Sequence, residues 1–104
     1  MKKQKDFVDK VYLVESIVNS ASLVSVEDMR GPARLPEFVD ARMAVWFVLN
    51  KHIGMPYTMI ARLYNRDHTS IMHGVSKVDR QPTNLQEWVK EGIEKEWKMW
   101  GFLK

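Results

Sequence analysis

The stretch that decides the fold is Arg66-Asp67-His68-Thr69-Ser70-Ile71-Met72-His73. Asp67 is a favoured N-cap residue, because its carboxylate can accept hydrogen bonds from the unpaired backbone N–H groups of the next turn. Three short polar side chains follow it, those of His68, Thr69 and Ser70. The stretch therefore predicts the start of a helix whose first turn carries both hydrogen-bond donors and acceptors.

The rest of this helix has an apolar stripe. Ile71, Val75 and Val78 recur at helical spacing, and we expect them to hold one face against a core. The polar first turn would then remain exposed. Recognition helices of helix-turn-helix proteins present such a turn to the major groove of DNA, where each base pair offers its own pattern of donors, acceptors and methyl groups.

The stretch resembles the signature of the DNA-binding C-terminal domain of DnaA-type chromosomal replication initiators, approximately Arg-Asp-His-Thr-Thr-Val-Leu-His-Ala. Identical residues stand at Arg66, Asp67, His68, Thr69 and His73. Conservative replacements stand at Ser70, Ile71, Met72 and Gly74, and Lys77-Val78 resembles the Lys-Ile that follows in the family. The resemblance continues upstream through Ala41-Arg42 and covers Val11 to Asp79, about two thirds of the chain.

The resemblance implies an all-α, Trp-repressor-like helix-turn-helix domain that binds double-stranded DNA. Together with the polar first turn, it assigns base contacts to Asp67, His68 and Thr69, although N-capping alone would account for Asp67. Eight residues before Arg42, it places Arg34 on the arginine that the family inserts into the minor groove, where an arginine responds to groove width. Phosphate contacts are expected from Arg30, Arg42, Arg66, Ser70 and Lys77.

Some of these assignments have alternatives. Arg30 and Arg34 could be solvated loop charges, and Arg66 could pair with a nearby carboxylate. The family usually has two glycines before Arg66, whereas here Asn65 follows Tyr64. Asn tolerates the left-handed conformation that such a turn needs. The family's basic loop is also richer in Lys and Arg, and the glutamine after its conserved arginine is Met43 here.

Composition fits a small globular domain. The chain has 104 residues, 45% of them hydrophobic and 28% charged, with a net charge of +3 and no cysteine. These values predict a single domain over residues 1–104 without disulfides or thiolate metal sites. We see neither a secretory signal nor a membrane span, and expect a cytoplasmic protein of bacterial, phage or plasmid origin.

Periodicity and breakers predict the elements. Residues 30–36 should form a loop, because two prolines and a glycine there interrupt any helix. The apolar centre of the helix 37–51 should be buried. The predicted helices are 6–20, a short turn at 25–28, 37–51, 57–64, one from 67 to before Pro82, and a last one at about 84–100.

Nothing in the sequence indicates catalysis or a cofactor. His68 and His73 are five residues apart, which does not align them on one helix face, and no carboxylate completes a metal site. No glycine belongs to a Gly-Lys-Ser/Thr phosphate loop, so we expect no ATP binding of the initiator type. The alternative function is a protein-interaction module that retains the fold without binding DNA. In either case the Trp- and Lys-rich last helix could contact a replication or regulatory protein.

Overall fold

The structure of the chain is a computed structural model that describes residues 2–81, 87, 91–92 and 94–95, with side chains from Val8 onward. All regular structure among these residues is helical, which confirms the all-α prediction. The elements are α1 (Lys2–Ser22), α2 (Val26–Arg30), α3 (Pro36–Val48), η1 (Leu49–Ile53), α4 (Tyr57–Tyr64) and α5 (His68–Arg80).

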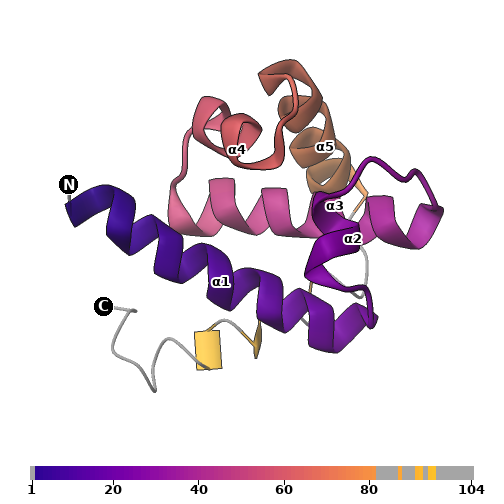
Figure 1. Cartoon of the computed structure of the whole chain (residues 1–104), viewed down its shortest axis with the longest axis horizontal. Helices are drawn as coiled ribbons and strands as arrows, with labels where there is room; N and C mark the ends of the chain where they lie inside the picture. Colours follow the sequence, from indigo (N-terminus) through magenta and orange to yellow (C-terminus); the bar gives the residue numbers. More distant parts are fainter. Residues whose placement is uncertain (1, 82–86, 88–90, 93, 96–104) are drawn as a thin grey trace.

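Helix α3 lies at the centre of the domain. Figure 1 shows α1 on one side of α3, and α4 and α5 together on the other side. Helix α2 packs against α1 and α3, and the loop 31–35 runs from its end to the start of α3. Of the described residues near the C-terminus, 91–92 and 94–95 lie beyond α1, where the backbone of Gly92 comes close to Ile17.

The core forms around α3 because that helix is apolar on nearly every face. All residues of 41–48 are buried, as predicted for its apolar centre. The ring of Trp46 meets Tyr64 of α4 edge-on, with ring centroids 5.8 Å apart and planes at 84°. Ile71 and Val75 of α5 are also buried, and Val78 packs partly buried against the core, which confirms the predicted apolar stripe. Helix α5 is therefore fixed to α3 along its inner face.

Local signals set most helix ends. The hydroxyl of Ser25 accepts a hydrogen bond from the backbone N–H of Asp28 (3.1 Å) and caps α2. Gly54 ends the long helix in the left-handed conformation, with a φ of 87° that suits a residue without Cβ. The last turn before it, η1, is a π-helix, which the sequence did not predict.

Several predicted bounds differ from the structure, and one predicted helix falls mostly outside it. Helix α2 includes Arg30, which was predicted in the loop 30–36, and the predicted helix 37–51 runs from Pro36 through η1 to Ile53. Helix α1 begins at Lys2 and ends at Ser22, so it is longer at both ends than the predicted 6–20. Most of the predicted last helix at 84–100 lies outside the described residues, although 87, 91–92 and 94–95 are helical. Among the described residues, no helix combines the length and apolar character needed to cross a bilayer.

Candidate nucleic-acid interface

The segment from α4 to α5 has helix-turn-helix geometry. Helix α4 ends at Tyr64, and Asn65 then adopts the left-handed conformation with a φ of 52°. The backbone N–H of Arg66 donates to the carbonyl oxygen of Ala61 (2.8 Å), which closes the turn. Helix α5 begins at His68. Asn65 thus takes the left-handed conformation that the turn requires, in place of the family's glycines.

Asp67 occupies the N-cap position through its backbone alone. Its carbonyl oxygen accepts hydrogen bonds from the N–H groups of Ser70 (3.0 Å) and Ile71 (3.3 Å). Its carboxylate forms no capping hydrogen bond, contrary to the prediction. The side chain is 76% exposed, with Oδ1 3.8 Å from Nδ1 of His68. Since capping does not occupy the carboxylate, its oxygens can accept hydrogen bonds from a ligand.

The first turn of α5 is exposed, while the next turn enters the core. His68, Thr69 and Ser70 are all exposed, and Ile71 is fully buried. The same helix therefore combines an anchored inner face with a polar end that meets solvent. This is the arrangement that the apolar stripe predicted.

Arg42 has a structural role in place of the expected phosphate contact. Its side chain is buried at 4% exposure. Its guanidinium group donates to four backbone carbonyl oxygens, those of Asp28 (3.2 Å), Met29 (2.8 Å), Gly31 (2.9 Å) and Ala33 (3.0 Å). These carbonyls belong to the end of α2 and to the loop 31–35, so Arg42 holds the base of that loop against α3.

Arg30 is partly exposed but paired with a buried carboxylate, which argues against the expected phosphate contact. Its Nε and Nη2 donate to the two carboxylate oxygens of Glu15, at 2.8 and 2.9 Å. The guanidinium also lies 5.6 Å from the ring centroid of Tyr64, within cation–π range. The hydrogen bond to Glu15 raises the pKa of Arg30. A bidentate pair with a buried carboxylate neutralises this arginine before any nucleic acid approaches.

Arg66 is half-buried and has no carboxylate partner among the described residues. Its guanidinium donates instead to the carbonyl oxygens of Tyr64 (3.2 Å) and Gly31 (2.9 Å). Gly31 thus accepts from both Arg66 and Arg42. The pKa of Arg42 is lowered by burial and then by the nearby charges of Arg66 and Arg34, although an arginine stays protonated in proteins. The loop consequently carries overlapping positive charge.

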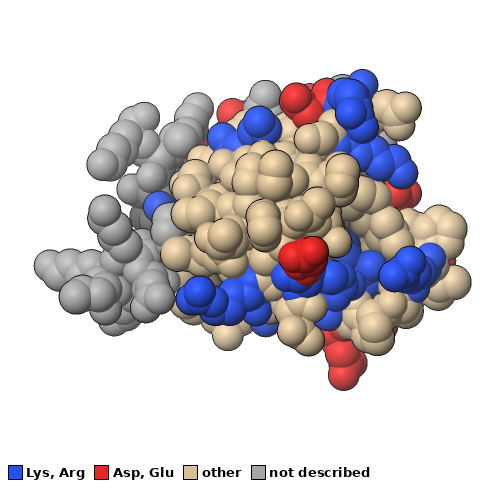
Figure 2. Space-filling view, turned by 90° about the horizontal axis from the view of Figure 1, so that it is seen from above, with Lys and Arg blue, Asp and Glu red and all other residues tan. Residues whose placement is uncertain are grey.

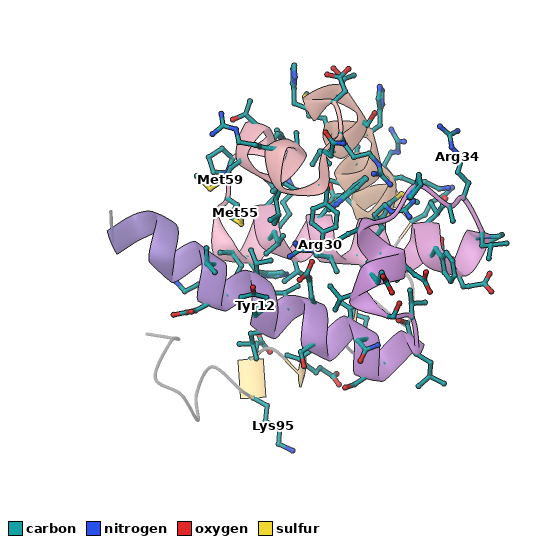
Figure 3. All side chains as sticks on the ribbon, viewed as in Figure 1. Tyr12, Arg30, Arg34, Met55, Met59 and Lys95 are labelled. Carbon is teal, nitrogen blue, oxygen red and sulfur yellow. The ribbon has the colours of Figure 1, made fainter. Side chains whose placement is uncertain are left out.

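Arg34 is exposed at the other end of this loop. Figure 3 shows its side chain pointing away from the body of the molecule, on the side where α5 lies. Lys77, in the last turn of α5, is also exposed. No carboxylate of a described residue lies within 4.0 Å of either side chain. Viewed from above α4 and α5, Figure 2 shows Lys and Arg in two groups on either side of a broad uncharged area.

Glu15 and Tyr64 form part of the site but were not predicted from the sequence. The hydroxyl of Tyr64 donates to Oε2 of Glu15 at 2.6 Å, and Glu15 is 1% exposed. Burial raises the pKa of Tyr64, and the neighbouring carboxylate raises it further, so its hydroxyl remains a donor. The available signal was the position of Glu15 within an apolar stripe, between the buried Val14 and Val18.

The all-α fold and the exposed first turn of α5 place the chain in the helix-turn-helix class of DNA-binding domains. Domains of this class are typically non-enzymatic. A sequence model described as "Bacterial dnaA protein helix-turn-helix" matches residues 11–78. The chain belongs to this family. The match includes α2, α3, α4 and nearly all of α5, together with the loop that bears Arg34.

Individual relatives agree with the family match. The chain is 39% identical over 59 residues to the chromosomal replication initiator protein DnaA of Thermomicrobium roseum, which covers 56% of this chain and 13% of the relative. It is 31% identical over 81 residues to the DnaA of Acholeplasma laidlawii (76% and 18%), and 24% identical over 83 residues to that of Kosmotoga olearia (80% and 19%). The chain therefore spans less than a fifth of the length of these relatives.

Proposed function

We propose that this chain binds double-stranded DNA sequence-specifically, at a site resembling the DnaA box, and acts without catalysis in replication control or transcription regulation in the bacterial cytoplasm. The first turn of α5 enters the major groove, with Asp67, His68 and Thr69 at base edges. Arg34 enters the adjacent minor groove. Phosphate contacts come from Arg66, Ser70 and Lys77.

The observation that carries this proposal is the exposure of polar groups on a firmly anchored helix end. His68, Thr69 and Asp67, whose carboxylate forms no capping hydrogen bond, are all exposed. Ile71, which follows them in the helix, is fully buried. Together these side chains offer donors, acceptors and a methyl group, which are the groups that base edges in the major groove can pair with. Anchoring through Ile71 limits the entropy lost on binding.

The charges beside this turn support the same function. Arg34 and Lys77 have no described carboxylate within 4.0 Å, and Arg66 donates only to backbone carbonyls. Unneutralised cations on one face attract a polyanion and bring its phosphates to defined positions. Arg30 and Arg42 are excluded from this set, because Arg30 forms an ion pair with Glu15 and Arg42 is buried.

The first test is selection of bound duplexes from a random library, followed by fluorescence anisotropy on the enriched sequence. We expect one enriched motif, and a linear decrease of log K with log salt concentration, with a slope of roughly −0.9 for each phosphate contacted. Three contacts would give a slope of about −2.7. No enrichment and no binding at low salt would refute DNA binding and favour the alternative of a protein-interaction module.

The second test separates base contacts from general attraction. His68→Ala and Thr69→Ala should each reduce discrimination between the enriched and a mismatched site by about 1–3 kcal/mol, with little change in non-specific binding. His73→Ala is a matched control, because this histidine is exposed on the same helix but lies outside the first turn. If His68→Ala weakened all duplexes equally, His68 would not contact a base.

A further inference from the structure

Glu15 is a buried carboxylate that joins three parts of the domain. It lies on the inner face of α1 and is 1% exposed. Its Oε1 accepts from Arg30 Nη2 (2.9 Å), and its Oε2 accepts from Arg30 Nε (2.8 Å) and from the Tyr64 hydroxyl (2.6 Å). Burying a carboxylate is costly unless hydrogen bonds satisfy it. These three bonds satisfy both oxygens of Glu15.

The two partners of Glu15 occupy corresponding places in the chain. Arg30 is the last residue of α2 and directly precedes the loop 31–35 that carries Arg34. Tyr64 is the last residue of α4 and directly precedes the turn that leads to His68. One carboxylate is thus bonded to both residues from which the proposed minor-groove and major-groove segments depart.

A second connection joins the same two segments further along the chain. The carbonyl oxygen of Gly31, the first residue of the loop, accepts from Arg66, in the turn before α5, at 2.9 Å. Arg42 donates to the same oxygen, also at 2.9 Å. The loop and the turn are therefore tied together at their starting points, while Arg34 and His68 remain exposed.

We propose that Glu15 is a positioning residue for DNA recognition, and that it fixes the separation between Arg34 and the first turn of α5. This inference rests on the proposed DNA-binding function. Adjacent grooves of a duplex lie at set distances, so a protein that contacts both benefits when its two contact segments are held in place before binding. Helix α1 itself lies on the far side of α3 from α4 and α5, so Glu15 acts through Arg30 and Tyr64.

A double-mutant cycle between Glu15→Gln and Arg34→Ala tests this. Affinity is measured on two duplexes with the same enriched core, one flanked by an A-tract with a narrow minor groove and one flanked by G·C pairs. In the wild-type background, Arg34→Ala should reduce the preference for the A-tract flank by about threefold or more. In the Glu15→Gln background the same substitution should change that preference by less than about twofold, because Arg34 is no longer held near the groove.

Val18→Ala is the matched control. Val18 is fully buried on α1, one turn after Glu15, and its side chain makes no hydrogen bond. It should lower the urea midpoint by truncating the core, yet leave the effect of Arg34→Ala on flank preference as in the wild type. A general loss of stability would instead affect both backgrounds alike.

The outcomes separate the inference from the function on which it rests. If the wild type binds neither duplex, the proposed function fails. If the wild type binds and Arg34→Ala has the same effect in the wild-type, Val18→Ala and Glu15→Gln backgrounds, the inference alone is wrong. The inference is also wrong if Arg34→Ala has no flank effect in the wild type.

A second variant keeps the test available if circular dichroism shows that Glu15→Gln does not fold. Tyr64→Phe removes one of the three hydrogen bonds to Glu15 and keeps the aromatic ring. In the Tyr64→Phe background, the effect of Arg34→Ala on the preference for the A-tract flank should be smaller than in the wild type but not lost. An undiminished effect in the Tyr64→Phe background would then overturn the inference.

Discussion

At the base of the loop 31–35, Arg42 is buried and donates to four carbonyl oxygens of its own chain, whereas Arg34 in the same loop is exposed and points into solvent. Arg30 and Arg66 resemble Arg42, since their guanidinium groups are also engaged within the protein. We call Arg30, Arg42 and Arg66 the arginine scaffold; the half-buried Arg66, which meets no described carboxylate, is the one of the three that also keeps the proposed phosphate contact. The exposed Arg34, Asp67, His68, Thr69, Ser70 and Lys77 form the recognition surface.

This difference teaches that charge near a DNA-binding motif has two separate uses. The scaffold arginines direct their hydrogen bonds to backbone carbonyls or to Glu15, and so shape the loop. The recognition surface keeps its polar groups available. Substitutions in the scaffold should therefore change the stability of the fold, and substitutions on the recognition surface should change DNA binding while altering the free energy of unfolding by no more than about 1 kcal/mol.

The largest effect is expected for Arg42→Ala. This substitution removes four hydrogen bonds and leaves carbonyl oxygens without their buried donor, so the free energy of unfolding should fall by about 3–5 kcal/mol. Urea unfolding followed by circular dichroism measures it. Arg42→Lys should recover less than half, because an ammonium group lacks the planar fork. Arg34→Ala serves as the recognition-surface counterpart and should change stability by less than about 0.5 kcal/mol. If Arg42→Ala and Arg34→Ala lowered the free energy of unfolding equally, the distinction between the arginine scaffold and the recognition surface would be wrong.

Helix α5 shows the same contrast between its inner and outer faces. A Cβ on Gly74 would lie 2.8 Å from Cε3 of Trp46 and 3.2 Å from Cγ of Met43. Gly74→Ala should therefore destabilise the fold by about 1–3 kcal/mol, despite the better helix propensity of alanine. The family signature has alanine at this position, and here the ring of Trp46 occupies the space that its methyl group would need.

Thermal and urea unfolding of two further variants sharpen this prediction. Ser76→Ala, on the exposed face of α5, should alter the free energy of unfolding by less than about 0.5 kcal/mol. In a Trp46→Leu background, Gly74→Ala should cost less than it does beside the tryptophan, because the contacting ring is gone. An unchanged cost in that background would show that the Trp46 contact is not the cause.

The next effect concerns pH and the hydroxyl that binds Glu15. Burial and Glu15 raise the pKa of Tyr64 above its ordinary value near 10. The unfolded state therefore loses this proton first as pH rises, so the stabilisation is complete below about pH 10 and is lost progressively above it. The slope is about 1.4 kcal/mol per pH unit for one proton. Urea midpoints between neutral and alkaline pH should fall more steeply for the wild type than for Tyr64→Phe. If the urea midpoints of the wild type and Tyr64→Phe fell in parallel with pH, the hydrogen bond between Tyr64 and Glu15 would not account for the alkaline loss of stability.

Much of the helix-turn-helix could be predicted because its signals are local. Asn65 and the position of Asp67 mark the turn, and Ile71 and Val75 mark the buried face. The side-chain contact of Asp67 was predicted wrongly, because residue type favours the N-cap backbone but does not fix the rotamer of an exposed carboxylate.

The scaffold could not be separated from the recognition surface in the sequence. Arg42 bonds to carbonyls 9 to 14 residues away, and Arg30 to a carboxylate 15 residues away, so their partners depend on the packing of α1, α2 and α3. The spacing that relates Arg34 and Arg42 to the family says nothing about burial. Glu15 was the one local sign, as a charged residue on an apolar stripe whose neighbours Val14 and Val18 are buried.

The smallest effect is expected for Lys77→Ala, where a member of the recognition surface also belongs to a helix end. Lys77 lies in the last turn of α5, where a cation interacts favourably with the helix dipole, so stability should fall by only about 0.3–1 kcal/mol. If Lys77 contacts a phosphate, the salt slope of DNA binding should become shallower by about 0.9, equally on every duplex. Lys95→Ala is the control, because Figure 3 places this exposed lysine on the opposite side of the molecule from α5. It should leave the slope unchanged. A similar change of the salt slope for both lysines would mean that the slope reports net charge. Lys77 would then not be assigned to the recognition surface.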